Sequence, residues 1–143
     1  MTGPVCRGSG RRALCRSRGR NSTFPRPYNA AMNALVNRRC RPCEGGVPPL
    51  DAAEARRLHA ELDAGWVLDD EVTRLSRRFE FHGFNRALGF ANAVAWVAQV
   101  EGHHPELRVG WGYCDVEWTT HAIAGLSEND FICAAKTDAL FDG

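Results

Sequence analysis

The order in which helical and strand patterns follow one another constrains the fold of this chain more than any other feature. From Asp51, a residue suited to a helix N-cap, the pattern is helical, with Leu58 and Leu62 four residues apart. Strand patterns then come in pairs, and helical patterns separate the pairs. We expect a helix from residue 51 that Gly65 ends, strands at 66–68 and 72–81, a helix at about 83–100, strands near 106–109 and 113–120, and a closing helix from 127.

This order, α-β-β-α-β-β-α, predicts an α+β fold with a four-stranded antiparallel sheet and three helices on one face. A chain of 143 residues fits one domain with a hydrophobic core of its own. The open edges of so small a sheet favour pairing with another subunit.

The same patterns predict which side chains face the core. Ser127 and Asp130 resemble a capping box at the start of the closing helix, with Asp in place of Glu. Arg77 interrupts the alternation of its strand, which indicates an edge position or a twist. The expected core residues are Leu75, Phe79 and Phe81 in the second strand, Phe84, Leu88, Ala91, Val94, Ala95 and Ala98 in the long helix, Cys114, Val116 and Trp118 in the last strand, and Phe131, Ile132, Ala134, Ala135 and Leu140 in the closing helix.

Charge divides the chain into two parts. Residues 1–43 contain ten arginines and no acid, whereas the remaining hundred residues carry a net charge of −9. We therefore expect residues 1–44 to be a basic, disordered arm and residues 45–143 to be the folded domain. Met32 is the start that we expect for the translated protein, and a mitochondrial transit peptide is the alternative for the leader. The acidic domain argues against nucleic acid as the main partner.

No apolar run is long enough to cross a membrane, and the N-terminus lacks the apolar segment of a secretory signal, so a cytoplasmic location is expected. The six cysteines form no disulfide framework. Cys40-x-x-Cys43 is half of a zinc site without a second half, and a redox role lacks the usual strand-to-helix context. The favoured interpretation is two free thiols in a mobile arm.

Three of the five histidines fall near one expected position. His103 and His104 lead into the third strand and His121 follows the fourth, so antiparallel pairing would bring them to one end of the sheet. Imidazole gives or takes a proton near neutral pH, and such a cluster can supply an acid and a base. A simple turn and a strand-end cap are the structural alternatives. A metal site is disfavoured, because adjacent residues in an extended chain point to opposite faces.

The spacing around these histidines resembles that of the pterin-4a-carbinolamine dehydratases. His103-His104-Pro105 is followed after five residues by Trp111, after nine more by His121, and after eight more by Asp130. The similarity extends over about residues 51–140, and the other matching segments are Phe79-x-Phe81, Phe84-Asn85-x-Ala87-x-Gly89-Phe90 and Thr120-His121-x-x-x-Gly125-Leu126-Ser127. The departures are Gln99, where the family has a charged residue, Leu107 in place of an aromatic residue, and Ala124 in place of a glycine.

The resemblance implies a lyase that dehydrates 4a-hydroxytetrahydrobiopterin to quinonoid dihydrobiopterin and water, so recycling the pterin of aromatic amino-acid hydroxylases within tetrahydrobiopterin biosynthesis. It implies His103 and His121 as the acid/base pair and His104 as the residue that orients the pterin. It further implies a homodimer or homotetramer that needs no metal and no organic cofactor. The substrate-binding residues by the same resemblance are Gly102, Pro105, Thr119, Thr120 and Asp130.

Two other functions stay open at this point. Members of the family also act as dimerisation cofactors of a transcription factor, a coactivator-type binding module that would use the outer helix face. A dehydratase-like protein acting on a different pterin is the second alternative. Retention of all three histidines favours catalysis, since an adaptor has no chemical reason to keep them at these spacings.

Overall fold

A computed structural model describes residues 32–42 and 48–141 of the chain. The expectations for residues 1–31, including the Met32 start and the transit peptide, lie outside the described residues. The elements in chain order are α1 (Met32–Val36), α2 (Ala52–His59), β1 (Val67–Leu68), β2 (Leu75–Glu80), α3 (Phe84–Glu101), β3 (Glu106–Gly110), β4 (Tyr113–Trp118), the 3-10 helix η1 (His121–Ile123) and α4 (Glu128–Phe141).

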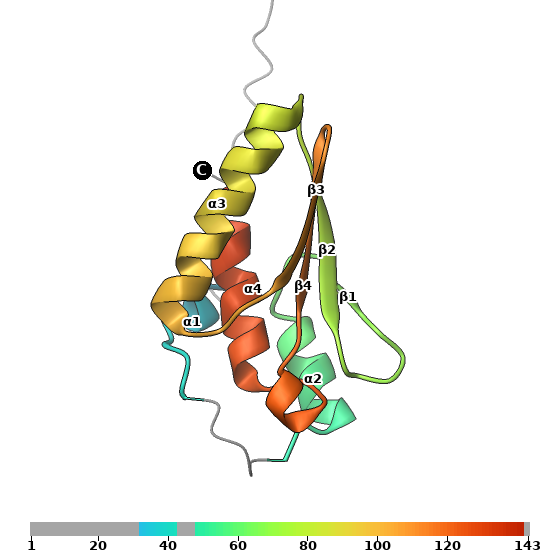
Figure 1. Cartoon of the computed structure of the whole chain (residues 1–143). Coiled ribbons are helices and arrows are strands. Elements are labelled where there is room, and N and C mark those ends of the chain that lie inside the picture. The colour runs from blue at the N-terminus through green and yellow to red at the C-terminus, as the bar shows by residue number, and fades with distance from the viewer. Residues whose placement is uncertain (1–31, 43–47, 142–143) are drawn as a thin grey trace, which may run out of the picture.

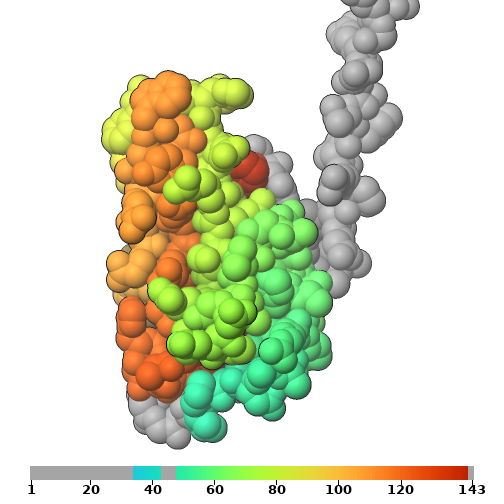
Figure 2. All heavy atoms as spheres, turned by 90° about the vertical axis from the view of Figure 1, so that its right-hand side faces the viewer, coloured from blue at the N-terminus to red at the C-terminus, as the bar shows by residue number. Residues whose placement is uncertain are grey.

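The four strands form one antiparallel sheet in the order β1-β2-β4-β3. Helices α3 and α4 lie along one face of this sheet (Figure 1). Figure 2 shows the opposite face, where β2, β3 and β4 lie at the surface and none of the described helices covers them. The α+β class and the four-stranded antiparallel sheet are therefore confirmed. The three-helix arrangement is only partly met, because α1 is an additional helix and both α1 and α2 contact α4.

Helix α1 falls within the segment that the sequence assigned to a disordered arm. Leu35 is fully buried, and α1 packs against α4. A helix of only five residues is too short to show a periodic pattern, and it is marginal without tertiary contacts. The expectation of disorder is thus wrong for residues 32–42, whose helix depends on packing rather than on local sequence.

The alternation of β4 is confirmed, since Cys114, Val116 and Trp118 are all fully buried. The long helix is different. Phe84 and Leu88, expected in the core, are 45% and 41% exposed. The buried residues of α3 are Ala87, Phe90, Ala91, Val94 and Ala98. Ala95 and Leu140 are also exposed, contrary to expectation. Apolar residues lie on several sides of α3, so periodicity alone does not identify the buried side.

Arg77 interrupts the β2 pattern because it takes part in a buried ion pair. Its guanidinium donates to Asp138 Oδ1 at 2.6 Å and lies over the Phe79 ring, 4.5 Å from the centroid. The indole N–H of Trp66 donates to the same oxygen at 2.8 Å. Burial raises the pKa of Asp138 to about 6, although the Trp66 hydrogen bond and the Arg77 charge both act to lower it.

This pKa predicts a pH dependence that Asp138→Asn should remove. A carboxyl whose pKa is higher in the folded than in the unfolded state contributes stability at low pH, and that contribution is lost as pH rises from about 4 to 6. Relative to the Asn variant, the wild type should lose about 2 kcal/mol of unfolding free energy over this range. Urea unfolding of both proteins between pH 4 and 7 measures it. Parallel stability curves would contradict the assignment to Asp138.

Candidate active site

The two histidine segments lie at the same end of the sheet. Strands β3 and β4 are antiparallel, and Glu106 at the start of β3 faces Glu117 near the end of β4. The chain enters β3 through His103 and His104, and it leaves β4 toward His121, the first residue of η1. This placement confirms the antiparallel pairing on which the expected cluster depends. His104 and His121 are exposed, whereas His103 is buried.

A left-handed glycine directs His103 into the protein. Gly102 ends α3 with φ 65°, a conformation that glycine adopts without steric cost. The N–H of His103 then donates to the Ala98 carbonyl at 3.1 Å. The imidazole is 7% exposed and stacks on the Trp118 indole, with 5.6 Å between ring centroids and 12° between planes. The end of α3 and the end of β4 therefore hold the ring between them.

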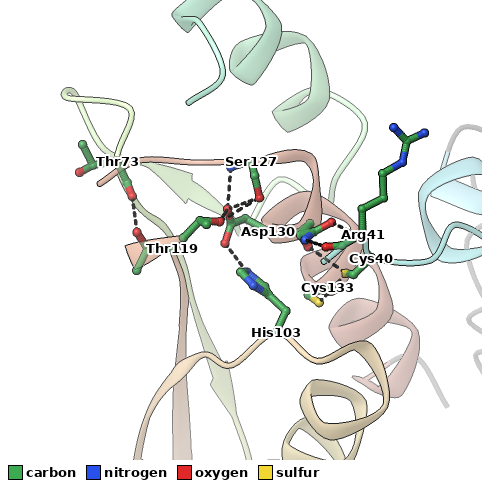
Figure 3. A network of polar contacts seen from close by, with 10 residues as sticks. Cys40, Arg41, Thr73, His103, Thr119, Ser127, Asp130 and Cys133 are labelled. Carbon is green, nitrogen blue, oxygen red and sulfur yellow. Dashed lines mark hydrogen bonds and ion pairs between the residues drawn. The ribbon is translucent and has the colours of Figure 1, made fainter. Parts of the chain in front are cut away.

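Asp130 is the partner of His103. Its carboxylate is fully buried, and Oδ1 lies 2.6 Å from His103 Nε2 (Figure 3). Its other oxygen, Oδ2, accepts from the Ser127 N–H at 2.8 Å and from the Thr120 hydroxyl at 2.7 Å. The Ser127 contact is the predicted capping-box bond, so α4 begins as expected. One carboxylate thus joins the start of α4 to the segments before β3 and after β4.

This geometry determines what His103 can do chemically. An ionised carboxylate only accepts hydrogen bonds, so Nε2 of His103 carries the proton that Asp130 receives. The other nitrogen, Nδ1, is then an acceptor in the neutral ring and a donor in the imidazolium. Because Nε2 is engaged with Asp130, Nδ1 is the ring nitrogen that remains for proton exchange.

The hydroxyls of Thr119 and Thr120 both form hydrogen bonds with other residues of the protein. Thr120 is 2% exposed and bonds Asp130, and its oxygen also lies 2.8 Å from the Ser127 hydroxyl. Thr119 donates to the Thr73 carbonyl at 2.8 Å, which fastens the β1–β2 loop to the end of β4. Both residues support the site. The contacts of Gly102, Pro105, Thr119, Thr120 and Asp130 with a substrate stay a prediction.

Two features of the site were not predicted from the sequence. Trp118 was expected in the core but not as the surface on which His103 stacks. Glu101, two residues before His103, has a side chain only 3% exposed and accepts from the Cys40 N–H and from Lys136 Nζ. Burial raises the pKa of Glu101, but these two contacts outweigh it, so the pKa lies below its usual value. No local pattern could reveal this carboxylate, because its partners are distant in the sequence.

A hollow of about 540 Å³ lies elsewhere, on the open face of the sheet. It is lined by residues of β2, β3 and β4, among them Arg78 and Asp115. None of the three histidines lines it. Within residues 32–42 and 48–141, no group of three or more His, Cys, Asp or Glu side chains is arranged to hold a metal ion. In the same part of the chain, no helix is long and apolar enough to cross a membrane.

Residues 48–140 match the model of the pterin 4 alpha carbinolamine dehydratase family, which is well over half of the chain. The chain belongs to this family. Its dehydratases are hydro-lyases, and the match includes every histidine and carboxylate of the candidate site. The enzyme class expected from the resemblance is therefore confirmed.

Relatives of this chain match it over the same region. A protein of Nitrosomonas europaea, provisionally named as a pterin-4-alpha-carbinolamine dehydratase, is 54% identical over 75% of this chain and 93% of its own length. One of Nitrosomonas eutropha with the same name is 57% identical over 74% and 92%. The crystal structure of a transcriptional coactivator/pterin dehydratase from Brucella melitensis has 32% identity and a TM-score of 0.61, covering 65% of this chain and 98% of that one.

One departure from the family pattern has a structural consequence. Ala124, where the family resemblance has a glycine, ends η1 with φ 50° and ψ 42°. This left-handed conformation costs a residue with a Cβ atom about 1–2 kcal/mol. The chain keeps the turn nonetheless, because the Thr120–Gly125 bridge closes it and the Ala124 N–H donates to the His121 carbonyl.

Proposed function

We propose that this protein dehydrates 4a-hydroxytetrahydrobiopterin to quinonoid dihydrobiopterin and water. Membership of the dehydratase family supports the reaction class. The observation that carries the proposal is the buried His103–Asp130 pair, because it equips one histidine of the family motif for proton transfer. The two exposed histidines of that motif lie at the same end of the sheet, where a small molecule can reach them.

The reaction requires two proton transfers. The bond between C4a and its hydroxyl breaks, and the oxygen leaves as water after it receives a proton. A ring nitrogen loses a proton, and its electron pair forms the new double bond to C4a. We assign these transfers to His103 and His121 and the orientation of the pterin to His104. Asp130 is a positioning residue, since it acts on the pterin through the orientation and tautomer of His103.

The proposed reaction needs no metal and no organic cofactor, because both steps are proton transfers. We further propose that the enzyme works in the cytoplasm and recycles the pterin used by aromatic amino-acid hydroxylases. The hydroxylated pterin leaves the hydroxylase and decomposes in water. A second, freely diffusing enzyme that completes the dehydration would prevent this loss.

A stopped-flow assay with chemically generated 4a-hydroxytetrahydropterin tests the proposal. The purified protein should accelerate the appearance of the quinonoid product in proportion to enzyme concentration, and an added chelator should leave the rate unchanged. If no acceleration occurs with this compound but another carbinolamine pterin is dehydrated, the alternative substrate is correct. If neither compound responds, the dehydratase proposal is wrong.

A binding role is the second candidate, and exposed apolar side chains on α3 favour it. Phe84, Leu88, Trp96 and Val100 are 41–69% exposed and recur at multiples of four residues along the helix. Such a row on a soluble surface marks an interaction site. The Brucella melitensis protein is named both a coactivator and a dehydratase, so the two roles are not exclusive.

We propose that a second copy of this chain covers part of this surface in a homodimer or homotetramer. The outer edge of β3 pairs with no strand among the described residues, which leaves a second surface for self-association. Light scattering after size exclusion should give a multiple of the 15.8 kDa chain mass. Trp96→Glu should lower this multiple. Ala53→Glu, at an exposed position on α2 away from the row, is the control and should leave it unchanged. A monomer in the wild type would refute the proposal.

A further inference from the structure

Residues 38–41 contact both the end of α3, which leads into His103, and the start of α4, which carries Asp130. The N–H of Cys40 donates to Glu101 at the end of α3, with 2.9 Å between N and Oε2. At the start of α4, the Asn129 amide holds Arg41 from both sides: its Oδ1 accepts from the Arg41 N–H at 3.1 Å and its Nδ2 donates to the Arg41 carbonyl at 2.7 Å. Figure 3 shows this segment beside the site.

The same segment brings two distant cysteines into contact. Cys40 Sγ lies 3.6 Å from Cys133 Sγ, although 93 residues separate them in the sequence. Cys40 is half-buried and Cys133 is fully buried in the second turn of α4. The backbone around Cys40 is fixed on both sides by Glu101 and Asn129, so the two sulfurs are held as neighbours rather than meeting by chance.

We propose that Cys40 and Cys133 form a redox-active pair, whose oxidation to a disulfide fastens residues 38–41 to α4. A disulfide needs about 2.05 Å between sulfurs, so a side-chain movement of about 1.5 Å closes the present distance. This inference does not depend on the proposed dehydration. It revises the interpretation of Cys40 as a free thiol in a mobile arm, and Cys43 lies outside the described residues.

The oxidant that we specify is hydrogen peroxide. Cys40 is oxidised to a sulfenic acid while the peroxide is reduced to water. The Cys133 sulfur then displaces the hydroxyl of the sulfenic acid, the S–S bond forms, and the hydroxyl leaves as a second water molecule with the Cys133 proton. Two thiols and one peroxide therefore yield one disulfide and two waters, which balances both atoms and electrons.

The environment of the two sulfurs favours this order. The contact with Cys40 and burial both raise the pKa of Cys133, so Cys133 stays a thiol and is the less reactive sulfur toward the oxidant. Cys40 is the more accessible of the two and meets the oxidant first. Cys114, by comparison, is fully buried in β4, and burial raises its pKa to about 11. Cys114 therefore serves as an internal standard for an unreactive thiol.

The expected consequence of oxidation is a disulfide that stabilises the folded protein. A disulfide over so long a separation restricts the unfolded chain strongly, and stabilisation of the usual size should raise the melting temperature by about 10 °C. The disulfide would also hold in place the segment that contacts Glu101 and Asn129. These two residues immediately precede Gly102 and Asp130 in the sequence.

The experiment treats the full chain with hydrogen peroxide or with a reductant, blocks remaining thiols, and maps peptides by mass spectrometry. The expected product is a linked pair of peptides that contain Cys40 and Cys133, lighter by two hydrogen atoms than the reduced pair. The oxidised wild type should melt at a higher temperature than the reduced protein. Cys133→Ser should abolish both effects, whereas Cys43→Ser, the matched control, should retain both.

Three results would overturn the proposal. The first is a disulfide from Cys40 to Cys43 or to another cysteine in place of Cys133. The second is recovery of Cys40 and Cys133 as unlinked residues under conditions that modify exposed thiols. The third is a mapped Cys40–Cys133 link without an increase in melting temperature, which would show that the bond does not brace the fold. Comparison of two redox states of one protein avoids reliance on variants that fail to fold.

Discussion

Replacement of both His103 and His121 by alanine is expected to reduce the dehydration rate to that of the uncatalysed reaction. General acid–base groups each contribute about 10²–10⁴-fold, so each single variant should already lose at least 100-fold in kcat. The loss should appear in kcat rather than in KM, because proton transfer takes place only as the bonds change. The stopped-flow assay measures both constants.

His82→Ala is the matched control for these variants. His82 is an exposed histidine that lines a separate hollow with Phe81, Arg86 and Phe141. Its removal changes the same kind of side chain and should leave the rate within a factor of two of the wild type, since surface substitutions seldom affect the rest of a fold. Wild-type activity in the double variant, with correct folding by circular dichroism, would show that the proton-transfer groups lie elsewhere.

Asp130→Ala should have the largest effect on stability. It removes the acceptor of His103 Nε2, of the Ser127 N–H and of the Thr120 hydroxyl, all of which lie in or near the interior. An unpaired buried donor costs about 1–3 kcal/mol, and losing one partner of a buried charged pair costs about 3–5 kcal/mol. We expect a loss of about 3–5 kcal/mol in the unfolding free energy, measured by urea denaturation.

Two further variants separate stability from positioning. Thr120→Val removes only one of the donors to Asp130 and should cost about 1 kcal/mol. Asp130→Asn keeps an oxygen that can accept from His103 but removes the negative charge. Its kcat should fall while its KM stays near the wild-type value, because an amide can donate as well as accept and no longer fixes the tautomer of His103. An unchanged kcat would limit Asp130 to a structural role.

Local patterns sufficed for several parts of this molecule. The alternation of β4 predicted its buried face because side chains in a strand point to opposite sides in turn. The capping box predicted the start of α4, since its two partners are only three residues apart. The order of elements predicted the antiparallel sheet and, through it, that the segments carrying His103 and His121 leave the sheet at the same end.

Other parts depend on contacts between distant residues, which no local pattern encodes. The buried side of α3 was assigned wrongly at Phe84 and Leu88, because that helix is apolar on more than one side and only the sheet and α4 select which side is covered. Helix α1 was missed for a related reason, since five residues are too few to show a periodic pattern and their packing against α4 is a distant contact.

The sequence by itself therefore determined the fold class, the family and the residue types that bring proton chemistry to this protein. Short-range periodicity encodes the fold class, and the spacing of the motif residues carries the resemblance to the family. Tertiary structure decided which atoms join Asp130 to His103 across 27 residues, and it alone brought Cys40 to Cys133 across 93. The physical reason is that burial, charge pairing and the contact of two sulfurs depend on the three-dimensional distances between residues far apart in the sequence. The packing of α3 and α4 sets those distances.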